Sequence, residues 1–345
     1  MTRRSRFAPS VGRRKRTSTR VTNVADRQIA GFNGRKSSPE RFGTVLAIAT
    51  VTVLLFLVAG ASTADAAEPS PGTTNVTNVT DLPGAVAVDV VATEDGGYVV
   101  ATTANVDGSD DINDVDSVPH LVKVNAAGEI VWDRAYTDLA GGGVTVRGME
   151  ATADGGFAIA GDWEDGDDGY DPKGWLLKAD PTGRPVWSTI AGSQDWSGDF
   201  FWDVATGTDG GIAGVGRGGT AFIDQYEART GRQLAQTAWL YATDPSGTEV
   251  INRSFGNEPA GQFFDGVGAS DGGYLLAGRS GDTYTQFLRT TATGEIAWQT
   301  DIEWEGSPEP WQYNLLRVGD RYYATGAGGV NNTDAFVMRI DSGGE

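Results

Sequence analysis

The sequence predicts an all-β protein whose main domain is a five-bladed β-propeller of four-stranded antiparallel blades. The first observation is a tripeptide, Asp-Gly-Gly, that begins at Asp95, Asp154, Asp209 and Asp271. The second is that short apolar runs flank each copy, and the third is that no segment of this region has a helical period. Four short strands in a unit of about 50 residues are typical of a propeller blade.

Each repeat contains four apolar runs that align between the copies. The first strands are expected at VAVDVVAT, TVRGMEAT, FFWDVATG, FFDGVGAS and YNLLRVG, and the second at YVVATT, FAIAGD, IAGVGR, YLLAGR and YYATGAG. The third are expected at HLVKVN, GWLLKAD, AFIDQYEA (residues 221–228), QFLRTTA and AFVMRID. A fourth run ends in Trp in three copies. A β-sandwich does not need a repeat of this length, and a solenoid coil would be shorter.

The fourth runs carry a motif with a known counterpart. Gly-X-X-X-Trp ends at Trp132, Trp187 and Trp298, and residues 227–231 (EARTG) read as a turn between third and fourth strands. These features resemble the tryptophan-docking turn of quinoprotein-like (PQQ-like) propeller repeats, over about residues 85–341. The resemblance implies that each Trp is a structural wedge between adjacent blades. The chain departs from the quinone enzymes: it has no Cys pair, and copies three and five lack the Trp, with Ala235 in that place in copy three. This argues against a quinone cofactor.

The N-terminal region has a different composition. Residues 1–41 carry twelve basic and two acidic residues, a net charge of +10, and we expect them to be disordered. Residues 42–66 hold an uncharged apolar stretch followed by Ala-Asp-Ala, which predicts a signal peptide or a transmembrane anchor. Residues 67–83 read as a linker with a closing strand, and residues 84–345 as the propeller. The basic side would stay inside and the acidic domain would be exported to the cell surface or beyond.

The exported part is strongly acidic. From residue 67 onward it has fifteen basic and forty-three acidic residues, a net charge of −28, and its only lysines are Lys123, Lys173 and Lys178. Such a surface resembles that of proteins from salt-loving archaea, and it repels nucleic acid, which we exclude as a partner. The chain has no cysteine, so disulfides, thiol catalysis and Cys-ligated zinc are excluded as well.

A strand is missing from the repeat count. Copy five has three strands, and residues 75–80 (NVTNVT) form an unassigned β-prone segment before copy one. We expect this segment to pair beside residues 335–340 and close the ring, which would remove the exposed sheet edges. The alternative is that the chain belongs to a larger ring.

Acid–base chemistry would have to use carboxylates, because His120 is the only histidine and reads as a structural residue near the start of a strand. Copy five has a degenerate turn, Gly319-Asp320-Arg321, with Asp320 in the place of the turn aspartate. Six residues before the turn aspartate, on the innermost strand, the five copies have Asp89, Gly148, Asp203, Asp265 and Asn314. Symmetry would place these side chains in a ring near the axis, where they could hold a cation or supply the paired acids of a glycosidase. Alternatively, each Asp bonds neighbouring backbone N–H groups.

Two kinds of loop offer other sites on one face of the propeller. Acidic loops at residues 107–116 and 162–171 have oxygen ligands suited to Ca²⁺, with Asp107, Asp111, Asp165 and Asp167 as candidate ligands. They read equally as salt-adapted surface loops. The segments 194–202 and 303–313 are aromatic and acidic, and Trp196, Trp304 and Trp311 lie outside the expected strands. Exposed aromatics beside carboxylates are suited to sugars, whereas inward-folded ones would roof the blades.

The sequence therefore favours an extracellular, non-catalytic binding module, with a glycan or an envelope protein as partner. The candidate ligand contacts are Trp196, Trp304, Trp311, Asp89, Asp203 and Asp265. A carboxylate-dependent polysaccharide hydrolase and a purely structural envelope domain are the alternatives.

The charge of −28 predicts that folding depends on salt. The carboxylates repel one another over about 30 Å at about 0.01 M salt, but over only about 3 Å at about 1 M. We expect the melting temperature to rise steeply with sodium or potassium chloride, as measured by circular dichroism. A melt that is insensitive to salt over this range would contradict the prediction.

Overall fold

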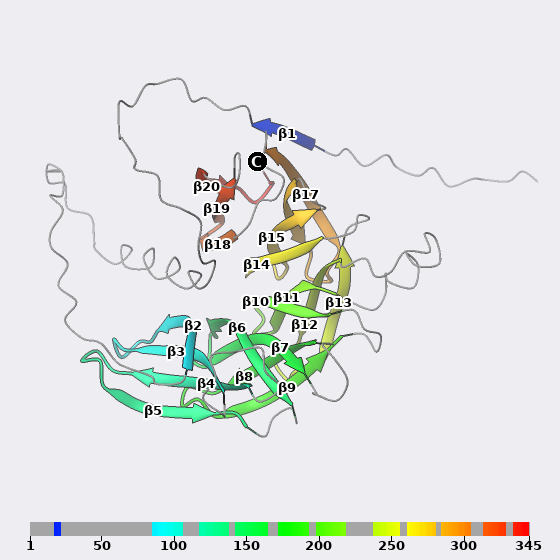
Figure 1. The fold of residues 1–345 in the computed structure, drawn as a ribbon. Helices are drawn as coiled ribbons and strands as arrows, with labels where there is room; N and C mark the ends of the chain where they lie inside the picture. Colours follow the sequence, from blue (N-terminus) through cyan, green and yellow to red (C-terminus); the bar gives the residue numbers. More distant parts are fainter. Residues whose placement is uncertain are drawn as a thin grey trace, which may run out of the picture.

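The structure is a computed structural model that describes residues 17–21, 85–105, 117–137, 142–164, 172–192, 198–218, 237–255, 261–280, 284–304, 313–328 and 334–344. Their strands form five separate sheets, which we call blades 1 to 5 in chain order (Figure 1). Within each blade the strands follow one another in sequence order and pair antiparallel. The predicted all-β architecture of four-stranded repeats is confirmed.

The blade strands have the following bounds. Blade 1 consists of β2 (Ala85–Ala92), β3 (Tyr98–Asn105), β4 (Ser117–Val124) and β5 (Ile130–Ala135), and blade 2 of β6 (Gly143–Ala151), β7 (Phe157–Glu164), β8 (Lys173–Ala179) and β9 (Pro185–Ala191). Blade 3 consists of β10 (Phe200–Thr206), β11 (Ile212–Arg217), β12 (Ala238–Thr243) and β13 (Glu249–Phe255). Blade 4 consists of β14 (Gln262–Gly268), β15 (Tyr274–Ser280), β16 (Tyr284–Thr290) and β17 (Ile296–Trp304), and blade 5 of β18 (Tyr313–Val318), β19 (Arg321–Gly328) and β20 (Asp334–Ile340).

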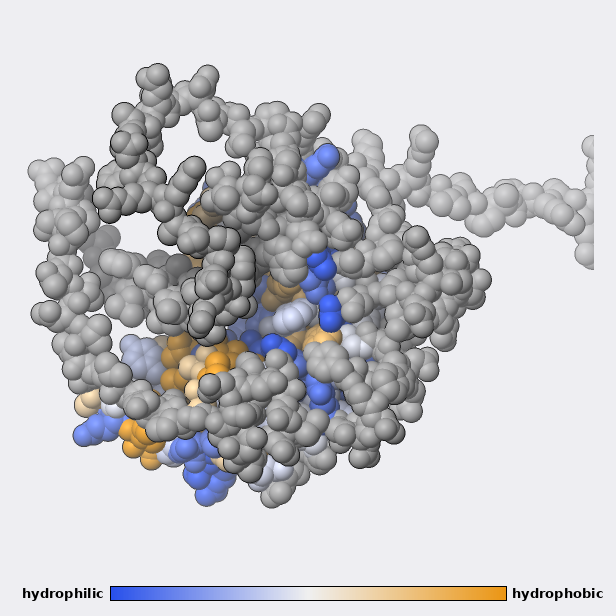
Figure 2. All heavy atoms as spheres, viewed as in Figure 1, coloured by the Kyte–Doolittle hydropathy of each residue, from blue (hydrophilic) through white to orange (hydrophobic). Residues whose placement is uncertain are grey.

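The blades follow one another around an arc, with the first strand of each on the inner side and β5, β9, β13 and β17 on the outer side (Figure 1). Polar and apolar side chains meet on the inner side of the arc, where the space-filling view leaves them uncovered (Figure 2). This is the radial arrangement of a β-propeller.

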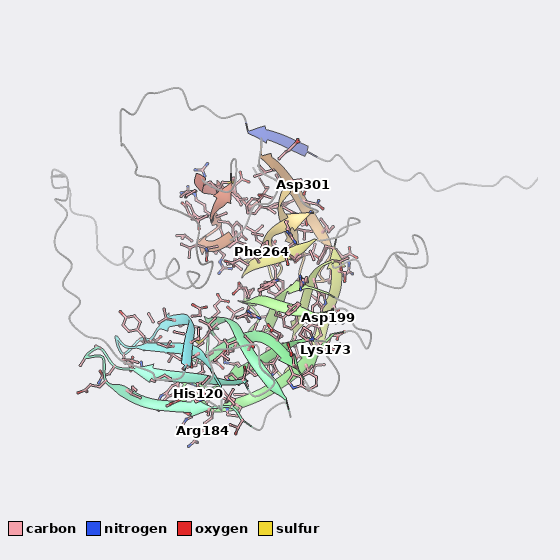
Figure 3. All side chains as sticks on the ribbon, viewed as in Figure 1. His120, Lys173, Arg184, Asp199, Phe264 and Asp301 are labelled. Carbon is pink, nitrogen blue, oxygen red and sulfur yellow. The ribbon has the colours of Figure 1, made fainter. Side chains whose placement is uncertain are left out.

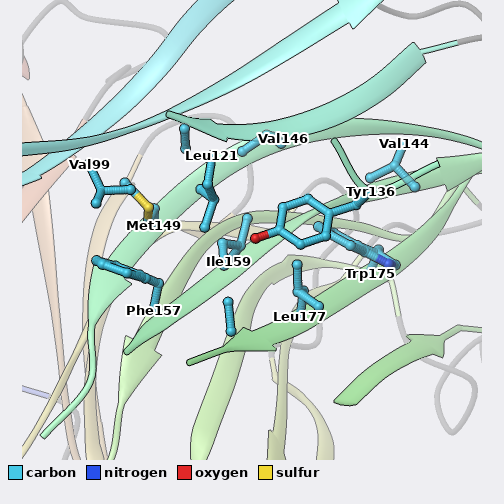
Figure 4. Close-up of a cluster of buried hydrophobic side chains, with 12 residues drawn as sticks. Val99, Leu121, Tyr136, Val144, Val146, Met149, Phe157, Ile159, Trp175 and Leu177 are labelled. Carbon is cyan, nitrogen blue, oxygen red and sulfur yellow. The ribbon is translucent and has the colours of Figure 1, made fainter. Parts of the chain in front are cut away.

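Four apolar cores lie between consecutive blades. The core between blades 1 and 2 includes Leu121, Phe157 and Trp175, which are at most 2% exposed (Figure 4). Corresponding clusters join blades 2 and 3, blades 3 and 4, and blades 4 and 5. Blades 2 to 4 therefore pack against a neighbour on both faces, as the repeat requires, and blades 1 and 5 each contribute to one of these clusters.

The two glycines of Asp-Gly-Gly serve different purposes. Gly96 and Gly155 both have φ of +79°, a conformation that a side chain would strain. The second glycine has an ordinary φ, but there is no space for a side chain. A Cβ on Gly97 would lie 2.3 Å from the Val124 carbonyl oxygen on the third strand. The first glycine is thus required by the turn, and the second by the close approach of two backbones.

The aspartate of the turn binds a buried cation from the third strand. Asp95 accepts hydrogen bonds from Thr93 Oγ1 (2.6 Å), the Gly97 N–H (3.1 Å) and Lys123 Nζ (2.6 Å), and these bonds hold the pKa of Asp95 below its usual value. Lys178 binds Asp154 in the same way at 2.7 Å, and in blade 4 Arg289 binds Asp271. Three of the fifteen basic residues of the acidic region, Lys123, Lys178 and Arg289, therefore fasten hairpin turns.

The fourth-strand tryptophans lie against the next blade. A Cβ on Gly183 would lie 2.7 Å from the Trp132 ring, and one on Gly247 would lie 2.7 Å from the Trp187 ring. Trp298 lies equally close to Gly344, and its Nε1 donates to the Ser342 carbonyl oxygen at 2.9 Å. Each ring thus covers the glycine of the turn that follows the third strand of the next blade, which couples the outer parts of the blades.

The expected third strand of copy three was wrong. Residues 221–228 were expected there, but β12 (Ala238–Thr243) takes that place, and residues 244–248 (DPSGT) form the turn in place of residues 227–231. Ile251, not Ala235, is therefore the counterpart of the wedge tryptophans, and it lies against Gly294 of blade 4. The side chain of Trp239 explains why β12 is the third strand, because it is fully buried and stacks on Phe201 with ring centroids 4.6 Å apart.

Several expectations fall outside the described residues. These are the apolar segment 42–66, the linker 67–83 and the pairing of residues 75–80. Within the N-terminal segment 1–41, β1 (Thr17–Val21) runs parallel to β17. No helix among the described residues is long and apolar enough to span a bilayer.

Replacing the wedge Trp187 by alanine should lower the free energy of unfolding by about 2–3 kcal/mol, because the half-buried ring leaves a gap over Gly247. The matched control is Val186→Ala, since Val186 is 59% exposed on the same strand and its loss should cost about 0.5 kcal/mol or less. Denaturant unfolding in constant high salt measures both. Equal effects of the two substitutions would show that the ring is not a wedge.

Candidate binding site at the propeller axis

The inner strands of blades 1 to 4 carry a β-bulge at the same place. The register with the second strand skips one residue, which is Val88, Arg147, Trp202 or Phe264 in the four blades. Bulges re-aim side chains and are frequent beside functional sites. In each of these blades the bulge residue has no partner on the second strand, whereas the residue after it is paired.

The residue after the bulge joins its blade to the next. Asp89 Oδ2 accepts the Met149 N–H at 3.0 Å, Asp203 Oδ2 accepts the Gly266 N–H at 3.2 Å, and Asp265 Oδ2 accepts the Leu315 N–H at 2.8 Å. In each pair the donor lies on the inner strand of the following blade. The structure thus brings the predicted axial aspartates together as blade connectors, the alternative raised from the sequence.

Blade 2 makes this connection with a different residue. Gly148 has no side chain, and a Cβ there would lie 2.6 Å from Asp203 Oδ1. Two residues later, Glu150 Oε2 accepts the Thr206 N–H of blade 3 at 2.5 Å. Sequence analysis missed Glu150, although a signal was present: it is the only acid at its alignment position, and it occurs in the one copy among the first four that lacks the aspartate.

Asp89, Glu150, Asp203 and Asp265 are half-buried, and this partial burial shifts the pKa values of their carboxyl groups. Burial raises the pKa of Asp89, and it raises the pKa of Glu150 to about 7. Asp203 and Asp265 hydrogen-bond to each other, and burial raises the pKa of Asp203 to about 6 and that of Asp265 well above its usual value. We expect two such neighbouring carboxyl groups to share a proton, because ionising both of them would be costly.

The bulge residues form an aromatic and basic layer beside the acids. The Arg147 guanidinium makes two hydrogen bonds to the buried Asp162, at 2.7 and 3.0 Å, and lies 5.3 Å from the centroid of the Trp202 ring. Trp202 and Phe264 are half-buried, with centroids 6.5 Å apart. Phe264 belongs to β14 and lies on the inner side of the arc (Figure 3). Aromatic surface and carboxylates therefore meet at the axis.

Two predicted positions are corrected. Trp304 was expected in a loop but is the last residue of β17, and Asp162, expected at the start of an acidic loop, is a buried residue of β7 held by Arg147. His120 lies in β4, where its Nδ1 is 3.0 Å from Asp133 Oδ1. The remaining candidates lie outside the described residues: Trp196, Trp311, Asp107, Asp111, Asp165 and Asp167.

In the part of the chain that the structure describes, no group of three or more acidic or histidine side chains is placed to hold a metal ion. Asp89, Asp203 and Asp265 each accept a backbone N–H of the next blade. The two acidic loops proposed for Ca²⁺ fall mainly outside this part.

No family model and no curated protein matches the sequence. Among solved structures, a protein of unknown function from Bacteroides caccae is similar at 14% identity and a TM-score of 0.44, covering 76% of this chain and 80% of that one. An α-L-arabinanase from Penicillium chrysogenum complexed with arabinobiose has 14% identity and a TM-score of 0.45, covering 73% and 75%. A β-xylosidase/α-arabinofuranosidase from a compost metagenome has 15% identity and a TM-score of 0.39, covering 76% and 94%. Likenesses this low carry no inference about activity.

The shared proton predicts a specific dependence of stability on pH. A raised carboxyl pKa adds stability that is full below about pH 4, near the unfolded pKa, and is lost as the pH rises through about 6. Asp203→Asn keeps a neutral group at all pH values, so the decline between pH 4 and 7 should shrink by about 1–3 kcal/mol. Thermal melts at constant salt measure it.

The control for general charge effects is Glu94→Gln, which removes one exposed carboxylate from the turn after β2. This variant should keep the wild-type decline. If Asp203→Asn also keeps it, Asp203 and Asp265 do not share a proton.

Proposed function

We propose that this chain is an exported, cell-surface or extracellular propeller that binds a glycan at its axis without cleaving it. The observation that carries the proposal is the pairing, on two neighbouring inner strands, of an aromatic bulge residue with an aspartate: Trp202 with Asp203 and Phe264 with Asp265. Aromatic rings cover the C–H faces of a sugar, and carboxyl groups bind its hydroxyls.

The net charge of the domain is also compatible with a neutral ligand. With a net charge of −28, long-range attraction would select cations, and a polyanion would be repelled. A neutral glycan is recognised by stacking and hydrogen bonds, which screening by salt leaves largely intact. The loop tryptophans Trp196 and Trp311 would extend the same surface.

A carboxylate-dependent polysaccharide hydrolase is the second candidate, favoured by the raised pKa values of Glu150 and Asp203. The geometry supports it less. Glycosidase carboxyls stand about 5–5.5 Å apart in retaining enzymes and about 6.5–9.5 Å apart in inverting ones, whereas Asp203 and Asp265 hydrogen-bond to each other. Both are also engaged with backbone N–H groups of the next blade. A purely structural envelope domain is the third reading.

We also propose that the repeats are of the quinoprotein-like type and that the domain is a five-bladed ring. The contacts of Trp132, Trp187 and Trp298 with turn glycines of the next blade support the first statement. No quinone is proposed, and Ca²⁺ is proposed only for the acidic loops.

The test is a glycan-array screen of the full chain in high salt, followed by substitutions. If the chain binds without cleaving, Trp202→Ala and Trp196→Ala should weaken binding by about tenfold or more, about 1.4 kcal/mol. Asp203→Asn should change it little, because the amide still bonds a hydroxyl. The control is Tyr98→Ala, an exposed aromatic at the turn end of blade 1, which should bind like the wild type.

If the chain is a hydrolase, the order reverses: Asp203→Asn abolishes turnover and leaves binding nearly intact. Product analysis of the bound glycans distinguishes the two. Binding of no glycan at all would reject both candidates and leave the structural reading.

A further inference from the structure

In blade 3 an alanine stands where blades 1, 2 and 4 have a cationic side chain. Lys123, Lys178 and Arg289 each pair with the second residue of the second strand, and each binds the turn aspartate of its own blade. The residue at this register in blade 3 is Ala242, which pairs with Ala213 and is fully buried. The fastening cation of the other three blades is thus replaced by a methyl group in blade 3.

The turn aspartate of blade 3, Asp209, has fewer partners than its counterparts. Asp95 accepts hydrogen bonds from a threonine hydroxyl, a backbone N–H and a lysine ammonium. Within the described part of the chain, Asp209 accepts one, from the Gly211 N–H at 3.0 Å. Gly207 takes the place of the threonine, since its N–H makes the same turn bond as that of Thr93. A carboxylate has about four lone-pair positions, so Asp209 can make further contacts.

Three oxygen atoms converge on the side of Gly207 where blades 1 and 2 have the threonine side chain. For a Cβ on this glycine, the nearest atoms would be Asp209 Oδ1 at 2.6 Å, the Tyr274 hydroxyl oxygen at 3.1 Å and the Gly211 carbonyl oxygen at 3.5 Å. The first and third belong to the turn of blade 3, and Tyr274 begins β15 of blade 4. The set therefore combines a carboxylate, a hydroxyl and a carbonyl oxygen from two neighbouring blades.

The same three kinds of oxygen bind the lysine ammonium in blade 2. Lys178 Nζ donates to Asp154 Oδ1 at 2.7 Å, to Thr152 Oγ1 at 2.5 Å and to the Ala179 carbonyl oxygen at 3.2 Å. An ammonium group carries one positive charge and is surrounded by oxygen acceptors, as an alkali cation is in a protein. The lysine thus shows which kind of ligand this combination of oxygens holds.

Tyr274 supplies its hydroxyl from a buried position. The side chain is 4% exposed, and within the described residues its hydroxyl makes no hydrogen bond. Burial raises the pKa of Tyr274, and the nearby charge of Asp209 raises it further, so the hydroxyl stays neutral. In blade 5, Tyr322 takes the corresponding position and hydrogen-bonds to the Arg289 cation of blade 4. A tyrosine at this position thus faces a cation of the preceding blade, whereas at Tyr274 the preceding blade has Ala242 instead.

We propose that the turn of blade 3 binds a monovalent alkali cation, sodium or potassium, through Asp209 Oδ1, the Tyr274 hydroxyl and the Gly211 carbonyl oxygen. One carboxylate with two neutral oxygens matches a single positive charge, whereas Ca²⁺ takes about six to eight oxygen ligands, several of them from carboxylates. The ion joins blade 3 to blade 4 and fastens the turn as a lysine would. Stability then depends on which cation is present, and not on ionic strength alone.

The test compares melting temperatures of the full chain in KCl and in choline chloride, both at about 1 M, so that screening is equal in the two salts. Choline is too large to fit between the three oxygens. The wild type should therefore melt at a higher temperature in KCl. Asp209→Asn should reduce this difference by about 2–4 °C, because a bound ion stabilises the folded state by mass action.

The matched control is Asp95→Asn, which removes the same carboxylate from a turn whose cation is Lys123. This variant should melt at a lower temperature in both salts and keep the wild-type difference between them. Ala242→Lys supplies a tethered ammonium in blade 3. It should raise the melting temperature in choline chloride and remove the difference.

Three results would overturn the proposal: equal melting of the wild type in the two salts, an unchanged difference in Asp209→Asn, or an equal loss of the difference in Asp95→Asn. An Ala242→Lys variant that folds and keeps the full difference would overturn it as well. If this variant does not fold, the comparison of the two asparagine variants decides.

Discussion

The spacing of the inner strands depends on one repeated hydrogen bond, in which a carboxylate on one strand accepts a backbone N–H of the next. A hydrogen bond of this kind is worth about 0.5–1.5 kcal/mol when the acceptor is neutral and about 1.5–3 kcal/mol when it is charged. In blades 1 to 4 a bulge precedes the same position of the inner strand, and it is present in blade 2 as well, where Gly148 accepts no such bond.

The same bond explains why so acidic a protein places carboxyl groups in its interior. An unpaired buried carboxylate is costly, but one that accepts one or two backbone N–H groups is stabilised as an acceptor. At blades 3 and 4 the cost is lowered further, since Asp203 and Asp265 hold one proton between them. Glu150 shows that the connection requires a carboxyl oxygen within hydrogen-bond distance of the N–H on the next blade, and not an aspartate as such. A longer side chain from two positions away makes the bond where Gly148 cannot.

The repeat, most of its strands and the inner-strand aspartates could be predicted from the sequence, because a turn motif with two obligatory glycines marks the same point in four of the five copies. The prediction failed in blade 3, where two apolar segments competed for the third strand. The choice depends on packing: Trp239 fills the space beside Phe201, which no local pattern encodes. The signal in the sequence was residues 244–247 (DPSG), which repeat residues 180–183 (DPTG) of blade 2. The contribution of Arg147 and Glu150 depends on neighbours about 15 and 56 residues away.

At the bulges of blades 1, 3 and 4, two adjacent residues have different roles: one lines the inner side of the blades and the next connects two blades. The aspartate or its substitute joins each inner strand to the next, while Val88, Arg147, Trp202 and Phe264 differ completely from blade to blade and make none of these carboxyl bonds. The lining can therefore vary between blades while the connecting bonds stay the same, although Arg147 and Trp202 have partners of their own in Asp162 and Gln262. Proteins that share this scaffold need not share a ligand, and a comparison of their lining residues will separate them better than overall similarity does.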